Sequence, residues 1–253
     1  MINSEKHGSV LILTINRPYA GNSINAETAR ELEIAVGAAA KDNDLRAVII
    51  TGYGQKYFCA GGDIKEYRDV TNRNDLDKVM GHMRRALINL ETLNIPTIAA
   101  INGFCLGGGL ELTLAADIRI SSSKAKFALP QSRLGIIPGW HGIERLVRLI
   151  GRGRTTMLAA GGQLFDAYEA ERLGLVDEIV TDQLVLERAE QIASEFDHAA
   201  PLALHGIKKV VRQVANTPES SSEEVFADLW FSEDHREAED AFAEKRSAIF
   251  KGR

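Results

Sequence analysis

A stretch in which an apolar run leads into three consecutive glycines constrains this chain most. From Ile98 the residues are apolar enough for a buried strand, glycines follow at 107–109, and a helical pattern continues to Ala116. Glycines at a turn from strand to helix leave backbone N–H groups uncovered and close to a bound group. Because helix N-termini favour negative charge, these donors could hold an oxyanion that forms on a carbonyl. Glu111 falls in the first helical turn, so the stretch indicates carbonyl or thioester chemistry beside a carboxylate.

Two other glycine-rich motifs do not fit this stretch. A dinucleotide fingerprint would need its last glycine where Leu112 stands, and Glu111 would repel the pyrophosphate. A phosphate-binding P-loop would need a lysine where Gly109 stands. An NAD(P)-dependent enzyme is therefore disfavoured. A purely structural turn stays open, with glycines required by the chain path and Glu111 favoured by the helix dipole.

A second strand followed by a glycine turn lies about fifty residues upstream, a spacing within the range of repeated units. Residues 46–52 indicate a buried strand, and Gly61 and Gly62 then open a polar, helix-like stretch. An oxyanion hole commonly uses two N–H donors, and each glycine loop could supply one. Loss of one such donor typically costs ~10²–10³ in rate. The pair of loops therefore favours a catalytic role over a structural one.

Several motifs follow one another in a fixed order over nearly the whole chain. They are Asn16-Arg17-Pro18, Cys59-Ala60-Gly61-Gly62-Asp63-Ile64-Lys65, Asn102-Gly103 through Glu111, Leu134-Gly135-Ile136-Ile137-Pro138-Gly139, Gly174-Leu175-Val176-Asp177-Glu178-Ile179-Val180 and Phe242-Ala243-Glu244-Lys245-Arg246. This series resembles the crotonase, or enoyl-CoA hydratase/isomerase, superfamily. The resemblance implies an α/β fold, a crotonase-like spiral of ββα turns with a C-terminal helical trimerisation segment.

The resemblance also implies an acyl-CoA thioester substrate, with coenzyme A as part of the substrate and no separate cofactor. The backbone N–H groups of Gly62 and Gly108 would form the oxyanion hole for its enolate. The adenine would pack near Ala60 and Ile64. The other substrate-binding positions that it implies are Asp63, Lys65, Gly139, Trp140, Phe242 and Lys245.

Some of these positions have structural alternatives. Trp140 stands where family hydratases carry a small residue, and it would shorten or reshape the acyl pocket, or simply fill core. Phe242 and Lys245 match positions that reach a neighbouring subunit's nucleotide, where a cation suits the 3′-phosphate. They could instead be a packed phenylalanine and a solvated helix lysine. Tyr19 replaces a lysine that contacts phosphate in many members, and Arg17 or Lys65 could compensate.

The catalytic residues depart from the family pattern at one position. Family hydratases use two glutamates around one water; the first matches Glu111, but the second position holds Gln131. Glutamine cannot ionise, although it can hold a water by hydrogen bonds. Loss of one general acid or base commonly costs ~10²–10⁴ in rate. His141, with an unperturbed pKa of about 6.5, could replace the missing acid or could be structural.

The favoured function is an enoyl-CoA hydratase or dehydratase that stabilises a thioester enolate, with Glu111 as base. Because Gln131 replaces the second acid, a divergent member is the alternative: an acyl-CoA decarboxylase, thioester hydrolase, C–C lyase or isomerase. Family isomerases usually depend on the same second acid. A catalytically weak protein that only binds acyl-CoA is a further alternative, and it predicts affinity without turnover.

The composition excludes several other classes. A net charge of −5 without a basic tract argues against a nucleic-acid partner. Cys59 and Cys105 lie in the glycine loops, and buried thiols are favoured over a nucleophile or a disulfide. The histidines lack ligand spacing, so no metal site is expected. Neither a signal peptide nor a membrane span is recognised, and a cytoplasmic protein is predicted.

The hydrophobic pattern predicts where strands and helices lie. Strands are expected over residues 10–15, 45–51, 97–101, 117–121, 126–129 and 176–180, and helices over 26–41, 79–93, 142–150, 154–160 and 167–173. Residues 69–77 are the most polar and are expected to form a loop or loose helix. We expect a core with the CoA and active sites over 1–195. The family resemblance implies that residues 196–253 form a helical segment that docks between subunits of a homotrimer, or of a hexamer built as a dimer of trimers.

Overall fold

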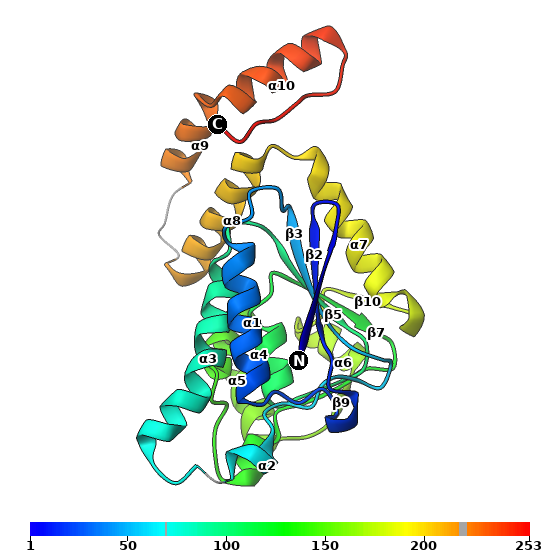
Figure 1. Ribbon diagram of the computed structural model, residues 1–253, viewed down its shortest axis with the longest axis vertical. Helices are drawn as coiled ribbons and strands as arrows, with labels where there is room; N and C mark the ends of the chain where they lie inside the picture. The colour runs from blue at the N-terminus through cyan, green and yellow to red at the C-terminus, as the bar shows by residue number, and fades with distance from the viewer. Residues whose placement is uncertain (69, 218–221) are drawn as a thin grey trace.

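Two β-sheets surrounded by helices make up the described chain, which comprises residues 1–68, 70–217 and 222–253 of a computed structural model (Figure 1). The larger sheet has the order β1 (Ile2–His7), β2 (Val10–Ile15), β3 (Ala47–Gly52), β5 (Thr97–Ile101), β7 (Ile118–Ser122) and β10 (Glu178–Val180). β1 is antiparallel to β2, and the remaining pairs are parallel. The smaller sheet has the order β4 (Tyr57–Cys59), β6 (Phe104–Leu106), β8 (Lys126–Ala128) and β9 (Phe165–Asp166).

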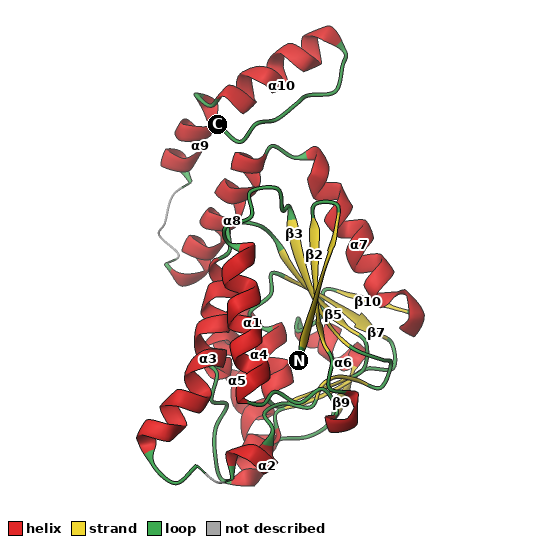
Figure 2. Cartoon of the chain, in the orientation of Figure 1, coloured by secondary structure: helices red, strands yellow, loops and turns green. Residues whose placement is uncertain are grey.

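Helices cover both faces of the larger sheet (Figure 2). In chain order they are α1 (Ala26–Ala39), α2 (Ile64–Tyr67), α3 (Arg73–Thr92), α4 (Gly108–Thr113), α5 (Gly142–Gly161), α6 (Ala167–Leu173), α7 (Val185–Glu195), α8 (Pro201–Asn216), α9 (Glu223–Trp230) and α10 (Glu233–Glu244). α9 and α10 lie at one end of the molecule, away from both sheets (Figure 1). Within the described ranges, no helix combines the length and apolar character needed to cross a membrane.

The central strands have continuous apolar runs, and both of their faces are buried. Every residue of β3 and β5 is buried. Since successive side chains of a strand point to opposite faces, Val48 and Ile50 of β3 join the core that includes α1 and α3. Ala47 and Ile49 join the second core, which α7 completes. Parallel strands covered by helices on both sides typically lack polar alternation.

A repeated strand–strand–helix unit brings the two glycine loops together. β3 is followed by β4 and α2, and β5 is followed by β6 and α4. β4 and β6 pair in parallel, so the loops that follow them both start at the carboxyl ends of these neighbouring strands. This arrangement confirms the predicted α/β fold, with its ββα units and C-terminal helices.

The strand predictions are confirmed in position, but some strands were missed. β1 carries almost only exposed residues, so no apolar run marks it, and its pairing with β2 forms it. The apolar stretch from Ile98 does not reach the glycines as one strand, because β6 intervenes before Gly107. β4 and β6 span three residues each, too few to show a periodicity.

Two helices differ from the predicted bounds. α3 begins at Arg73, because the side chain of Asn72 accepts a hydrogen bond from the backbone N–H of Asp75. Much of the polar stretch over 69–77, predicted as a loop or loose helix, is therefore helical, while Asp69 lies outside the described residues. α5 joins the two helices predicted over 142–150 and 154–160, with a non-helical Gly151 between them. α7 ends at Glu195, and the division at residue 196 into core and docking segment stays a prediction.

Candidate active site

The two glycine loops meet at a pocket with a volume of about 140 Å³. A Cβ on Gly61 would lie 3.1 Å from the amide nitrogen of Gly108, which shows how closely the loops approach. The lining includes these residues predicted from the sequence: Ala60, Gly62, Ile64, Gly108, Glu111, Gln131, Gly139 and Trp140. It also includes Tyr67, Met80, Gly107, Pro130, Leu134, Ile136 and Ile137, which were not predicted as site residues.

The amides of Gly62 and Gly108 are available to a ligand. Gly108 is the first residue of α4, so its N–H has no acceptor within the helix. Among the described residues, neither amide donates a hydrogen bond to another protein group. Both residues line the same pocket, and their joint action on one oxygen stays a prediction.

Glu111 is the buried carboxyl group of the pocket, with 2% of its surface exposed. Its Oε2 accepts hydrogen bonds from the amides of Trp140 (2.7 Å) and Gly142 (3.0 Å), and its Oε1 accepts one from Gly139 (3.2 Å). Burial raises the pKa of Glu111 to about 7, although these three amides and the charge of Arg145 act to lower it. A carboxyl group with a pKa near neutrality can both take up and release a proton during turnover.

The loop over residues 139–142 is shaped to hold Glu111. A Cβ on Gly142 would lie 2.6 Å from Cγ of Glu111, so only glycine allows this approach. His141 has a φ of 65°, a left-handed conformation that is rare for residues with a side chain. The loop thus aims its amides at one carboxylate at the expense of local backbone strain.

The His141 side chain lies outside the pocket. Its imidazole is 43% exposed, and Nδ1 lies 3.5 Å from Oε1 of Glu144. It is not part of the pocket lining, and His141 is the residue immediately before α5. The geometry therefore does not favour His141 as the replacement acid, because its position is determined by the backbone.

Gln131 occupies the position opposite Glu111. Its Nε2 donates to Oε1 of Glu111 at 3.2 Å. Its own Oε1 is buried and, within the described part of the chain, has no hydrogen-bond partner. A buried acceptor without a partner costs free energy. An O–H group of a ligand or water in the pocket would satisfy it.

Trp140 closes one side of the pocket and is almost fully buried. Its indole Nε1 lies 3.3 Å from Sδ of Met80, in α3. A Cβ on Gly108 would lie 2.2 Å from the indole ring, so the ring rests on the Gly108 backbone. The indole therefore limits the space beside the predicted oxyanion hole.

The remaining residues of the first glycine loop do not line the pocket. Asp63 pairs with Arg17 at 3.0 Å, and both side chains are largely buried. Arg17 also donates to the backbone oxygen of Ser23 at 2.6 Å. The Asn-Arg-Pro motif thereby ties the chain after β2 to the glycine loop through Arg17. Lys65 is exposed on α2.

Phe242 belongs to α10, which lies away from the sheets (Figure 1), and Lys245 is the first residue after this helix. Phe242 is 88% exposed, so the expectation of a packed phenylalanine is wrong within this single chain. Lys245 ends α10 in a left-handed conformation. Contact with a neighbouring subunit's nucleotide stays a prediction.

Both cysteines are free, buried thiols. Burial raises the pKa of Cys59 to about 12 and that of Cys105 well above its usual value. A thiol that stays protonated is a poor nucleophile. The prediction that both are small buried core residues is confirmed.

Comparison with known proteins supports the same chemistry. The sequence model of the enoyl-CoA hydratase/isomerase family matches residues 5–253. The chain is 38% identical to the short-chain-enoyl-CoA hydratase of Clostridium acetobutylicum, over 96% of this chain and 94% of that protein. It is 36% identical to the 2,3-dehydroadipyl-CoA hydratase of Escherichia coli, over 96% of both. The crystal structure of an enoyl-CoA hydratase from Bacillus anthracis superposes with a TM-score of 0.94 at 33% identity, covering 100% of this chain and 99% of that chain.

Proposed function

Because this chain belongs to the enoyl-CoA hydratase/isomerase family and is an enoyl-CoA hydratase-like lyase, we propose that Glu111 alone carries both of its proton transfers. The observation that carries this proposal is the placement of Glu111: a buried carboxyl group with a pKa of about 7 that lines the same pocket as Gly62 and Gly108. No second carboxyl group lines this pocket within the described ranges.

The amides of Gly62 and Gly108 would bind the thioester oxygen of a 2-enoyl-CoA. As water attacks C3, its proton passes to the Glu111 carboxylate. The C2–C3 π electrons form the C1–C2 double bond of the enolate, and the carbonyl π electrons move to the thioester oxygen. The resulting enolate is held by the two amides. The protonated Glu111 then delivers its proton to C2, which restores the thioester carbonyl. Dehydration is the reverse sequence.

Gln131 would orient the water. Its unpartnered Oε1 can accept a hydrogen bond from the water, while its Nε2 stays on the Glu111 carboxylate. The water would then donate one hydrogen bond to the Glu111 carboxylate and one to Oε1 of Gln131. A lone pair of the water oxygen would remain free to attack C3. Gln131 contributes position rather than a proton.

Trp140, Tyr67 and Met80 would restrict the acyl group to a short chain. The Trp140 ring lies on Gly108, and a Cβ on Gly62 would be 2.5 Å from the Tyr67 ring. Both aromatic rings therefore lie beside the two predicted oxyanion donors.

The coenzyme A portion would extend from the pocket over apolar side chains at its opening. Ile64 and Ile137 line the pocket yet are largely exposed, 64% and 74% respectively. Phe242 and Lys245 of a second subunit would complete the nucleotide site in a homotrimer or hexamer. A raised KM for the acyl-CoA when the oligomer dissociates into monomers would support this contribution of Phe242 and Lys245. A cytoplasmic location stays a prediction.

Loss of the enoyl absorbance of crotonyl-CoA tests the proposal. We expect the wild type to hydrate crotonyl-CoA and Glu111→Gln to lose at least ~10² in kcat while its melting temperature is retained. Wild-type protein that binds crotonyl-CoA without turnover would contradict the hydratase. Because Gln131 replaces an acid, malonyl-type and hydrolysable thioesters would then test the decarboxylase and thioester hydrolase alternatives.

A further inference from the structure

The loop that holds Glu111 is itself held from behind by arginines. Arg145, on α5, donates from Nη1 to the backbone oxygens of Trp140 (2.7 Å) and His141 (3.4 Å). Arg84, on α3, donates to the backbone oxygen of Gly139 at 2.9 Å. The carbonyls of this loop therefore face cations, while its amides face Glu111.

Arg145 is fixed in turn by Glu91 of α3. The Glu91 Oε2 accepts from Nε of Arg145 at 3.0 Å and lies 2.9 Å from its Nη2. Arg145 is 4% exposed, so its position leaves little freedom. A planar guanidinium can hold a carboxylate with two nitrogens and backbone carbonyls with a third.

We propose that the Glu91–Arg145 pair is a positioning device that presses the 139–142 loop onto Glu111 and so determines when that carboxyl ionises. The peptide between His141 and Gly142 receives Arg145 at its carbonyl and gives its N–H to Glu111. Aligned hydrogen bonds of this kind polarise one another. The strained conformation of His141 persists only where its surroundings hold it. The proposal rests on the proposed function for its effect on turnover.

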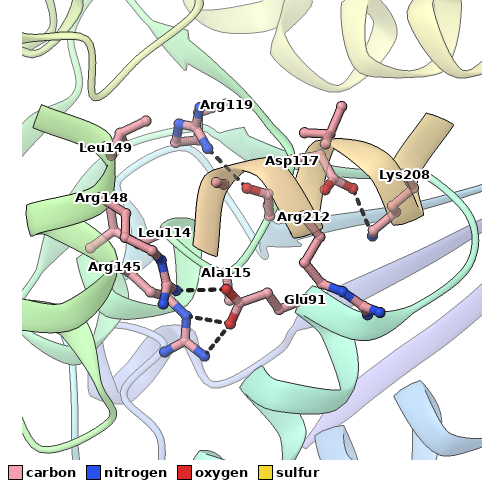
Figure 3. A pocket seen from close by; sticks show the side chains of 13 residues that line it. Glu91, Leu114, Ala115, Asp117, Arg119, Arg145, Arg148, Leu149, Lys208 and Arg212 are labelled. Carbon is pink, nitrogen blue, oxygen red and sulfur yellow. Dashed lines mark hydrogen bonds and ion pairs between the residues drawn. The ribbon is translucent and has the colours of Figure 1, made fainter. Parts of the chain in front are cut away.

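Other charges surround the pair and must be considered in any test. A cleft of about 210 Å³ is lined by Arg145 itself and by these further charged residues: Glu91, Asp117, Arg119, Arg148, Lys208 and Arg212 (Figure 3). Lys208 pairs with Asp117 at 2.7 Å, and Arg119 pairs with Asp177 at 2.8 Å. Glu144 faces His141, and Asp77 faces Arg84 at 3.5 Å.

Arg148 provides a matched control. It binds the other oxygen of Glu91 at 2.7 Å, but it makes no hydrogen bond to the 139–142 loop among the described contacts. Arg145→Met and Arg148→Met therefore each remove one arginine from the same glutamate. Only the first removes the support of the loop. Arg145→Lys keeps the charge but not the planar fork, and it tests the geometry if Arg145→Met folds poorly.

The first readout is the titration of Glu111 itself. It is monitored through the infrared band of the protonated Glu111 carboxyl group. The band is assigned by its loss in Glu111→Gln, and no substrate is needed. Arg145 stabilises the ionised carboxylate, so Arg145→Met should raise the midpoint by about one pH unit. Arg148→Met should leave it unchanged, and Arg145→Lys should give a smaller rise than Arg145→Met.

The second readout is crotonyl-CoA hydration. Arg145→Met should lower kcat about tenfold at neutral pH with little change in KM, because the loop orients the reacting carboxyl group. Equal titration midpoints in Arg145→Met and Arg148→Met, with only a lowered melting temperature, would overturn the proposal. A shifted midpoint in a protein whose wild type does not hydrate crotonyl-CoA would uphold this inference and refute the proposed function.

Discussion

The indole ring of Trp140 rests on the α-carbon of Gly108, where an added Cβ would fall 2.2 Å from the ring. Gly108 supplies one predicted oxyanion donor, and Trp140 supplies an amide to Glu111. This contact thus links the predicted oxyanion donor of Gly108 to the loop that holds Glu111. It also shows why the position at 108 must be glycine in this chain.

Gly108→Ala should therefore destabilise the protein by about 1–3 kcal/mol, the usual cost of overpacking. In a Trp140→Leu background the same substitution should cost less than about 1 kcal/mol, because the obstructing ring is gone. Urea unfolding of the four proteins gives both values. Additive costs would show that the contact does not limit residue 108.

His141 is predicted to be dispensable for chemistry. His141→Gly should keep kcat within about twofold and should not reduce stability, since glycine adopts the left-handed conformation without strain. His141→Ala should also keep its activity. Steady-state kinetics and thermal melting check both variants. A loss of kcat above tenfold in both would restore His141 as the missing acid.

The ionisation of Glu111 should make the folded state less stable as pH rises. Its folded pKa of about 7 exceeds the ordinary 4.5, so the folded state holds the extra proton between these values. Stability is therefore greatest below pH 4.5 as far as this group is concerned, and it falls as pH rises toward 7. The difference of about 2.5 pKa units corresponds to about 3–4 kcal/mol at most, at 1.36 kcal/mol per unit.

Unfolding measured at pH 5.5 and pH 8 for the wild type and Glu111→Gln isolates this contribution. The decrease toward pH 8 should be smaller in the variant, because glutamine does not titrate. An identical decrease in both proteins would show that other groups cause it and that Glu111 has an ordinary pKa.

Asp63 is predicted to stabilise the first glycine loop rather than to bind substrate. Asp63→Asn leaves the largely buried Arg17 without its charged partner, which should cost about 3–5 kcal/mol of stability. Lys65→Ala is the matched neighbour, exposed on α2, and it should leave the free energy of unfolding unchanged. A higher KM for Asp63→Asn at unchanged stability would instead make Asp63 a substrate residue.

Local patterns in the sequence predicted an α/β fold, the two glycine turns and the position of Glu111 at the start of a helix. The spiral of ββα units and the role of Gln131 were implied only by the family resemblance. Met80 and Tyr67 lie in helical segments whose local pattern carries no sign of the pocket, so only the packing of α2 and α3 brings them there.

The residues that support the 139–142 loop could not be predicted from the sequence either. Glu91 and Arg145 are far apart in the chain and look like ordinary surface charges of amphipathic helices. His141 shows the opposite case: its neighbours in the sequence line the pocket, but its left-handed backbone places the side chain outside it, so a catalytic role stays an untested prediction.

The pH dependence of kcat/KM for crotonyl-CoA hydration tests most directly whether Glu111 acts alone. If Glu111 is the single catalytic carboxyl group, the profile has one acid limb with a midpoint near pH 7, activity is flat above it, and Glu111→Gln loses that activity. In Gln131→Glu a second ionising group should appear in the profile. A bell-shaped wild-type profile, or full activity in Glu111→Gln, would contradict the single-carboxyl mechanism.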